Sequence, residues 1–241
     1  MISNNDIKRI KSLSQKKFRD EYGLFVVEGE KMVEEALRSG FGVESVYRRE
    51  EIGENAMSRI SMLSSPSPVL AVVRKPSEKV PESLSDGLYL GLDTMRDPGN
   101  LGTVIRIADW FGIDTIFASK DTVDVFNPKV VQSTMGAVFR ITVHYVDLPA
   151  KASDFLKAGG KVYGTFLDGR NIYDRELETG EDSPVMIVIG NESEGISPAM
   201  EKLVSDRLYI PPFPASGTGS ESLNAAVAAA VTVAEFRRRL Q

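Results

Sequence analysis

The chain has 241 residues, of which 42% are hydrophobic and 26% charged, which fits a globular protein built as two modest domains or one large α/β domain. It has no cysteine and one histidine, His144, so disulfides, thiolate metal sites and cysteine nucleophiles are excluded, and we expect no metal. No apolar run approaches the ~20 residues of a membrane-spanning helix, and the first residues lack a secretory signal, so we expect a cytoplasmic protein without membrane contact.

The opening third of the chain predicts a small α/β domain. Apolar residues recur at helical spacing after Ser3 or Asn4, either of which can cap a first helix. Three more elements follow, namely a strand from Leu24, a helix from Glu30 to Gly40 and a strand from Val43 to Tyr47.

Basic side chains crowd the same region. The net charge of −5 disfavours a nucleic-acid partner mildly, but the distribution of charge matters more than its sum. The cluster therefore predicts contacts with nucleic-acid phosphates, and a solvated terminus explains it equally well. The candidate residues are Lys8, Arg9, Lys11, Lys16, Lys17 and Arg19.

A stretch rich in proline, serine and charge follows the apolar run at Val69 and predicts a linker. We expect a first domain at residues 1–75, a linker at 76–86 and a second domain at 87–241. Beyond the linker, apolar stretches alternate with helical patterns, which indicates a mainly parallel sheet. These stretches are LYLGL, TIFA, KVYGTF, VMIVIG and RLYIP.

Three segments of the second domain are candidates for chemistry, and each also has an ordinary structural interpretation. In the first, a strand runs through DPGNLG into a helix, where free backbone N–H groups favour anionic ligands, although the same letters make a common turn. It lacks the lysine of a phosphate-binding P-loop and the GxGxxG dinucleotide pattern, so a nucleotide hydrolase is disfavoured. Arg106 follows on the helix, where it can reach the strand ends or lie in solvent.

The second and third segments also follow apolar strands. VMIVIGNESEGIS places Gly190, Asn191 and Glu192 where open α/β sheets bind ligands, and Pro198 can begin a helix; a solvated loop is the alternative. YIPPFPASGTGSESLNAAV leads into an alanine-rich helix that Ser220 or Ser222 can cap.

Together and in this order, the three segments resemble the motifs of the SpoU (TrmH) family of RNA ribose 2′-O-methyltransferases. DPGNLGTVIRIADWFG is similar to the first motif, IGNESEGIS to the second and IPPFPASGTGSESLNAAVAAA to the third. The third departs from the compact family form by added residues between Pro211 and Ser222, among them Phe213, Pro214 and SGTGS. FVVEGEKMVEEAL, from Phe25, resembles the RNA-substrate-binding domain that many members carry.

The resemblance implies a fold, a cofactor and a set of site residues. The fold is an α/β domain with a parallel sheet and a C-terminal trefoil knot, and members are homodimers with the active site near the subunit interface. The cofactor is S-adenosylmethionine, and the implied substrate is ribosomal RNA in preference to transfer RNA. The implied catalytic residues are Asn100, Arg106, Glu192, Ser222 and Asn224, and the implied cofactor contacts are Thr165, Gly190, Ile210 and Leu223.

Arg106 matches the arginine that has been proposed as the general base in this family. A guanidinium offers only donors and stays protonated at neutral pH, so we expect Arg106 to hold an RNA phosphate and orient the hydroxyl. The alternative is a non-catalytic RNA-binding or ribosome-assembly protein on the same fold. A third interpretation, a nucleotide-binding α/β enzyme, fails because the chain lacks a phosphate-loop lysine.

Overall fold

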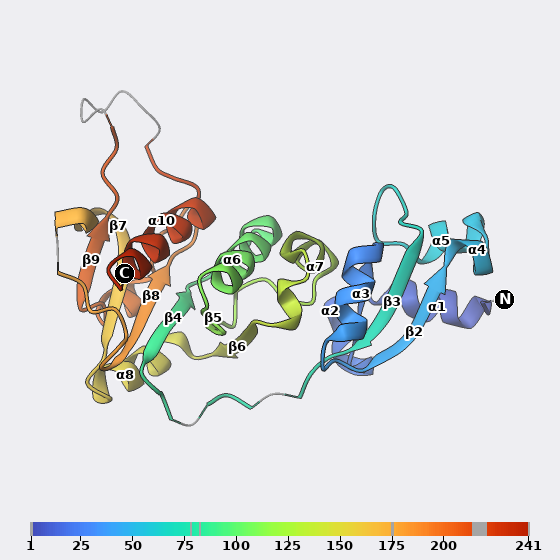
Figure 1. Cartoon of the computed structure of the whole chain (residues 1–241), viewed down its shortest axis with the longest axis horizontal. Helices are drawn as coiled ribbons and strands as arrows, with labels where there is room; N and C mark the ends of the chain where they lie inside the picture. The colour runs from blue at the N-terminus through green and yellow to red at the C-terminus, as the bar shows by residue number, and fades with distance from the viewer. Residues whose placement is uncertain (1, 78, 82, 175, 214–220, 241) are drawn as a thin grey trace. The chain divides into compact units, whose positions relative to one another are not determined.

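The computed structural model describes residues 2–77, 79–81, 83–174, 176–213 and 221–240. Contacts divide the chain into two compact units (Figure 1). The amino-terminal unit consists of Met1–Lys79 and Asp124–Arg140, and the carboxy-terminal unit of Val80–Val123 and Ile141–Gln241. The segment Asp124–Arg140 therefore belongs by its contacts to the first unit, although it lies in the sequence between two parts of the second. The predicted division at the linker does not include this feature.

The amino-terminal unit contains an antiparallel sheet in the order β1-β3-β2. The two predicted strands are present at β1 (Leu24–Glu28) and β2 (Val43–Arg48), and the apolar run at Val69 forms the third strand, β3 (Val69–Arg74). Side chains of α1 and α5 share a buried core with β1 and β3, so amphipathic helices cover the sheet. The helices are α1 (Asn4–Ser12), α2 (Lys16–Tyr22), α3 (Glu30–Arg38), α4 (Arg49–Ile52) and α5 (Glu54–Ile60).

Ser3 caps α1 by accepting a hydrogen bond from the Asp6 N–H, so one of the two predicted caps is confirmed. The segment Asp124–Arg140, with α7 (Pro128–Thr134), completes this unit. Its Phe126 lies 4.6 Å from Phe25 between ring centroids. Aromatic side chains from both parts of the chain thus build one core.

The carboxy-terminal unit is built on a six-stranded parallel sheet in the order β6-β5-β4-β8-β7-β9, which confirms the predicted parallel sheet. The strands are β4 (Gly87–Leu92), β5 (Thr115–Ser119), β6 (Thr142–Val146), β7 (Lys161–Asn171), β8 (Pro184–Ile189) and β9 (Asp206–Tyr209). The helices are α6 (Pro98–Trp110), α8 (Leu148–Lys157), α9 (Pro198–Glu201) and α10 (Ala225–Arg238).

Helices α6 and α10 pack side by side and in parallel (Figure 1). At their first turns Asn224 contacts Asn100, and at their last turns the Arg237 guanidinium donates to the carbonyls of Phe111 and Gly112. Asn224 caps α10 by accepting from the Ala226 and Val227 N–H groups. The prediction that Ser222 caps this helix is therefore wrong, because an asparagine nearer the helix fills that role.

The added residues of the third motif that include Ser220, Pro214 and SGTGS lie outside the described residues. Within the described ranges, no helix is long and apolar enough to span a membrane. The same part of the chain holds no cluster of three or more histidine, aspartate or glutamate side chains suited to a metal ion.

Candidate functional site

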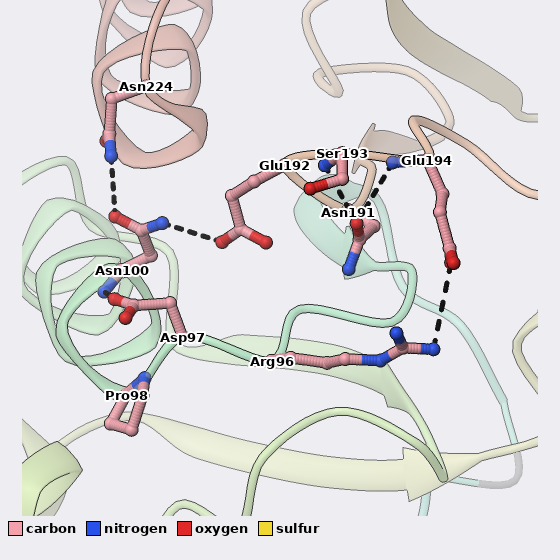
Figure 2. A pocket seen from close by; sticks show the side chains of 9 residues that line it. All are labelled: Arg96, Asp97, Pro98, Asn100, Asn191, Glu192, Ser193, Glu194 and Asn224. Carbon is pink, nitrogen blue, oxygen red and sulfur yellow. Dashed lines mark hydrogen bonds and ion pairs between the residues drawn. The ribbon is translucent and has the colours of Figure 1, made fainter.

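Two neighbouring parallel strands bring the first two motifs together. β4 pairs directly with β8, so the carboxyl ends of both strands lie at the same edge of the sheet. The first motif leaves β4 and begins α6, and the second motif leaves β8 as a loop. Between them lies a pocket of about 800 Å³ (Figure 2). It is lined by Arg96, Asp97, Pro98, Asn100, Asn191, Glu192, Ser193, Glu194 and Asn224.

Asn100 connects all three motifs in this pocket (Figure 2). Its side-chain nitrogen donates to the Glu192 carboxylate over 2.6 Å, and its side-chain oxygen accepts from the Asn224 amide over 2.9 Å. The Asn100 N–H in turn donates to Asp97, the N-cap of α6. The structure therefore brings three of the five expected catalytic residues into one hydrogen-bonded chain.

Two buried or half-buried side chains fasten the loops that carry this chain. The Asp93 carboxylate, 4% exposed, accepts from the Ser197 N–H, which ties the end of β4 to the second motif. The Asn191 amide donates to the Thr94 carbonyl, and its oxygen accepts the N–H groups of two following loop residues. Because both loops are held to each other, Glu192 stays within reach of Asn100.

Arg106 and Ser222, the other two expected catalytic residues, do not line the pocket. Arg106 is exposed on α6, and its guanidinium makes no hydrogen bond or ion pair within the described part of the chain. Ser222 is exposed two residues before the cap of α10. Neither residue joins the chain centred on Asn100.

Three of the four expected cofactor contacts lie on or directly after adjacent strands. Thr165 lies on β7, Gly190 directly after β8 and Ile210 directly after β9, and the parallel order β8-β7-β9 puts these strand ends at one edge. Leu223 is 49% exposed just before α10. A Cβ at Gly190 would lie 2.4 Å from the Gly195 carbonyl carbon, so the loop closes only around glycine. Such main-chain and aliphatic groups fit a cofactor bound mainly through backbone contacts.

A bulge follows Thr165 on β7. Thr165 and Arg170 both pair with Leu208, so four residues between them leave the ladder. Arg207 donates to Asp168 in this bulge and to Glu201. The hydrogen bond from the Arg207 guanidinium holds the pKa of Asp168 below its usual range, so this side chain stays ionised at lower pH than a free aspartate.

The six expected RNA contacts have different environments in the amino-terminal unit. The Arg19 side chain is 2% exposed and forms an internal ion pair with Asp124 over 2.6 Å, so it does not face solvent. Arg9 pairs with Glu44, Lys16 pairs with Asp20, and Lys11 donates to a backbone carbonyl. Lys8 and Lys17 are exposed, and neither makes an ion pair among the residues that the structure describes.

Apart from Glu192, the charged residues of the pocket were not predicted from the sequence. Three carboxylates line it, on Asp97, Glu192 and Glu194, and Arg96 brings a positive charge. Arg96 and Glu194 belong to different motifs and look like solvated loop residues in the sequence. Both residues lie close in sequence to motif residues, which is the feature that could have identified them. Their contact with each other depends on the pairing of β4 with β8.

Comparison with known proteins agrees with this arrangement. Residues 87–234 match the SpoU rRNA Methylase family, and residues 4–85 match the MRM3-like substrate binding domain. The chain is 33% identical to the 23S rRNA (guanosine(2553)-2′-O)-methyltransferase RlmP of Bacillus subtilis, over 97% of this chain and 96% of RlmP.

Solved structures of similar proteins share the fold over the whole chain. The AdoMet-bound rRNA methyltransferase of Sinorhizobium meliloti superposes with a TM-score of 0.85 at 30% identity, covering 100% of this chain and 97% of that one. The SpoU methyltransferase AviRb of Streptomyces viridochromogenes, in complex with AdoMet, gives 0.83 at 26% identity, with 99% and 98% covered. With its three motifs joined at one pocket and these relatives along its full length, the chain belongs to the SpoU rRNA Methylase family.

Proposed function

We propose that this protein transfers a methyl group from S-adenosylmethionine to a ribose 2′-hydroxyl in ribosomal RNA. The observation that carries the proposal is the hydrogen-bonded chain from Glu192 through Asn100 to Asn224, which joins three motifs at one pocket. Relatives that match over nearly the whole chain are named as rRNA 2′-O-methyltransferases, or have structures with bound AdoMet, which supports both the substrate and the cofactor.

Thr165, Gly190, Ile210 and Leu223 would hold the cofactor on β7 before its bulge, after β8 and β9, and before α10. When bound, S-adenosylmethionine supplies a methyl group that its sulfonium already activates. The task of the protein is then positioning, which can supply much of the rate. Glu192, Asn100 and Asn224 form a preorganised polar wall against which a ribose can be oriented.

Arg106 would act by gripping an RNA phosphate and orienting the hydroxyl, a role that suits an exposed guanidinium without a partner in the described chain. Ser222 would join it from the loop before α10. Arg106 and Ser222 both lie outside the pocket lining, so the proposed active site must include residues beyond this pocket. A homodimer with the active site near the subunit interface would bring such residues together.

Exposed apolar side chains support the proposed homodimer. Trp110 on α6 is 85% exposed and Val227 on α10 is 47% exposed, on helices that pack together. Trp110 follows Arg106 by one turn and lies on the same face of α6. A partner that covers Trp110 would therefore also approach Arg106.

The proposed domain division is an RNA-binding domain at residues 1–75, a linker at 76–86 and a catalytic domain at 87–241. Lys8 and Lys17 are the best placed of the basic candidates for RNA phosphates, because both are exposed and neither has an ion pair among the described side chains. A trefoil knot in the catalytic domain and a cytoplasmic location complete the proposal.

The first experiment measures transfer of labelled methyl from S-adenosylmethionine to unmodified ribosomal RNA, with nuclease mapping of the product. We expect ribose 2′-O-methylation that disappears in R106A while cofactor affinity is retained. Loss of cofactor binding in R106A would contradict its assignment. A protein that binds RNA but neither binds the cofactor nor transfers methyl would instead support the non-catalytic alternative.

A further inference from the structure

Arg96 lines the pocket, and its side chain extends from the loop before α6 toward Glu194 (Figure 2). Its side chain is 61% exposed and lies 3.7 Å from the Glu194 carboxylate, which is 66% exposed. An ion pair this long and this exposed stabilises a protein little, so the guanidinium can change partners at small cost.

The backbone before Arg96 is fixed. Thr94 has a φ of +60°, a left-handed conformation that a β-branched residue rarely adopts. It is held there on both sides: its N–H donates to Ser119 Oγ over 2.8 Å, and its carbonyl accepts from the Asn191 amide over 2.8 Å. Strain of this kind persists where the surrounding structure enforces it and is concentrated at functional sites.

The residues that flank Arg96 are equally constrained. Met95 is fully buried, and its carbonyl accepts from the Val123 N–H over 2.9 Å. Asp97 caps α6. The Cα of Arg96 is therefore held at the pocket, while its side chain keeps its freedom.

The charges around the pocket create a problem for an RNA substrate. The carboxylates of Asp97, Glu192 and Glu194 would repel the phosphates that flank a ribose. Of the described residues that line the pocket, Arg96 alone carries a positive charge. A guanidinium binds phosphate through two parallel hydrogen bonds, a geometry that a lysine does not reproduce.

We infer that Arg96 binds a backbone phosphate next to the target ribose, and that it leaves Glu194 when RNA enters the pocket. The inference rests on the proposed function, since it names a contact to the RNA of that reaction. In the free enzyme, the ion pair with Glu194 keeps the Arg96 guanidinium beside the pocket until a phosphate replaces the carboxylate.

The test uses R96Q and E194Q in the full chain, with unmodified large-subunit rRNA as the probe. RNA affinity is measured by filter binding over a range of salt concentrations, without cofactor, and methyl transfer is measured separately. R96Q should weaken RNA binding about tenfold and reduce the slope of log affinity against log salt by ~0.7–0.9, the value of one phosphate contact. E194Q should leave RNA affinity equal or higher, because it frees the guanidinium.

K157Q serves as the matched control, because Lys157 forms an exposed pair with Asp154 on α8, away from the pocket lining. It should leave both affinity and slope unchanged. Equal weakening by R96Q and E194Q would overturn the inference, since it would mean that the ion pair only shapes the loop. An unchanged slope in R96Q would overturn it as well. Absence of methyl transfer despite RNA binding that depends on Arg96 would refute the proposed reaction, while Arg96 would stand as a contact to an RNA phosphate.

Discussion

Asn100 uses both ends of its side-chain amide, donating to Glu192 and accepting from Asn224. In N100A both contacts disappear, and the polar wall of the pocket loses its centre. We expect the rate constant for methyl transfer to fall about 10²- to 10³-fold, the usual effect of removing a preorganised polar group, with cofactor affinity unchanged. Single-turnover transfer and calorimetric titration of the cofactor measure the two effects. T103A, on the exposed face of the same helix, should behave like the wild type; a drop in cofactor affinity alone would contradict this role for Asn100.

Arg19, one of the residues predicted from the sequence to contact RNA, is instead a buried residue that stabilises the amino-terminal unit. Its guanidinium donates to Asp124 and to the carbonyls of Leu13 and Ser14, and it is almost completely buried. In R19A the buried Asp124 carboxylate loses its ion-pair partner and, among the described residues, keeps only the hydrogen bond from the Phe126 N–H, so we expect the free energy of unfolding of the amino-terminal unit to fall by ~3–5 kcal/mol. Urea denaturation measures this loss.

K16A, which breaks an exposed pair with Asp20, should cost under ~1 kcal/mol. Equal losses in the two variants would contradict the prediction.

Residue by residue, the motifs predicted part of the site. Asn100, Glu192 and Asn224 were predicted from the resemblance, and the structure brings them together. The contact between Arg96 and Glu194 was not predicted, because it depends on which strands are neighbours. The strained backbone at Thr94 was not predicted either, since nothing in a threonine signals a positive φ.

At the scale of elements, the last turn of α10 is held by charge. Glu235 accepts hydrogen bonds from Arg238 and Arg239, and the bond from Arg238 above all lowers the pKa of Glu235 from its ordinary value of 4.5. The stabilisation is therefore fully present above pH 4.5 and is lost as the pH falls through the lowered value.

For E235Q we expect a loss of ~1–2 kcal/mol in the free energy of unfolding at neutral pH, at the low end because Arg238 is largely exposed. The gap from the wild type should close at acid pH, where both side chains are neutral. Urea midpoints measured across this range test it, with D154N on α8 as a control for an exposed pair. A gap that persists at acid pH would show that the contribution of Glu235 does not depend on its charge.

Helices with strong periodicity, such as α1 and α3, were predicted well, and so were the strands β1 and β8, which are continuous apolar runs. The missed strand β6 is short and only half-buried, so its apolar pattern is weak. β7 extends beyond its predicted end because a bulge carries it past Phe166. The order of strands in either sheet depends on long-range pairing, which local pattern does not encode.

For the whole molecule, Trp110 provides a direct test of the proposed dimer. W110D places a charge on a side chain that is 85% exposed, and a tryptophan at the centre of an interface contributes ~2 kcal/mol or more. We expect the dimer to dissociate at least ~30-fold more readily, as measured by sedimentation, with a parallel loss of methyl transfer. L156D, on an exposed leucine of α8, is the control. An unchanged dimer in W110D would exclude Trp110 from the interface.

The inclusion of Asp124–Arg140 in the amino-terminal unit affects the order in which the protein can fold during synthesis. Phe25 emerges from the ribosome long before Phe126, the ring against which it packs. At ~5–20 residues per second, the ~60 residues from Lys79 to Arg140 take about 3–12 s to make. During this interval the first domain to be translated lacks part of its core. The part of its core around Phe25 is therefore completed only after a segment encoded in the middle of the second unit has been made.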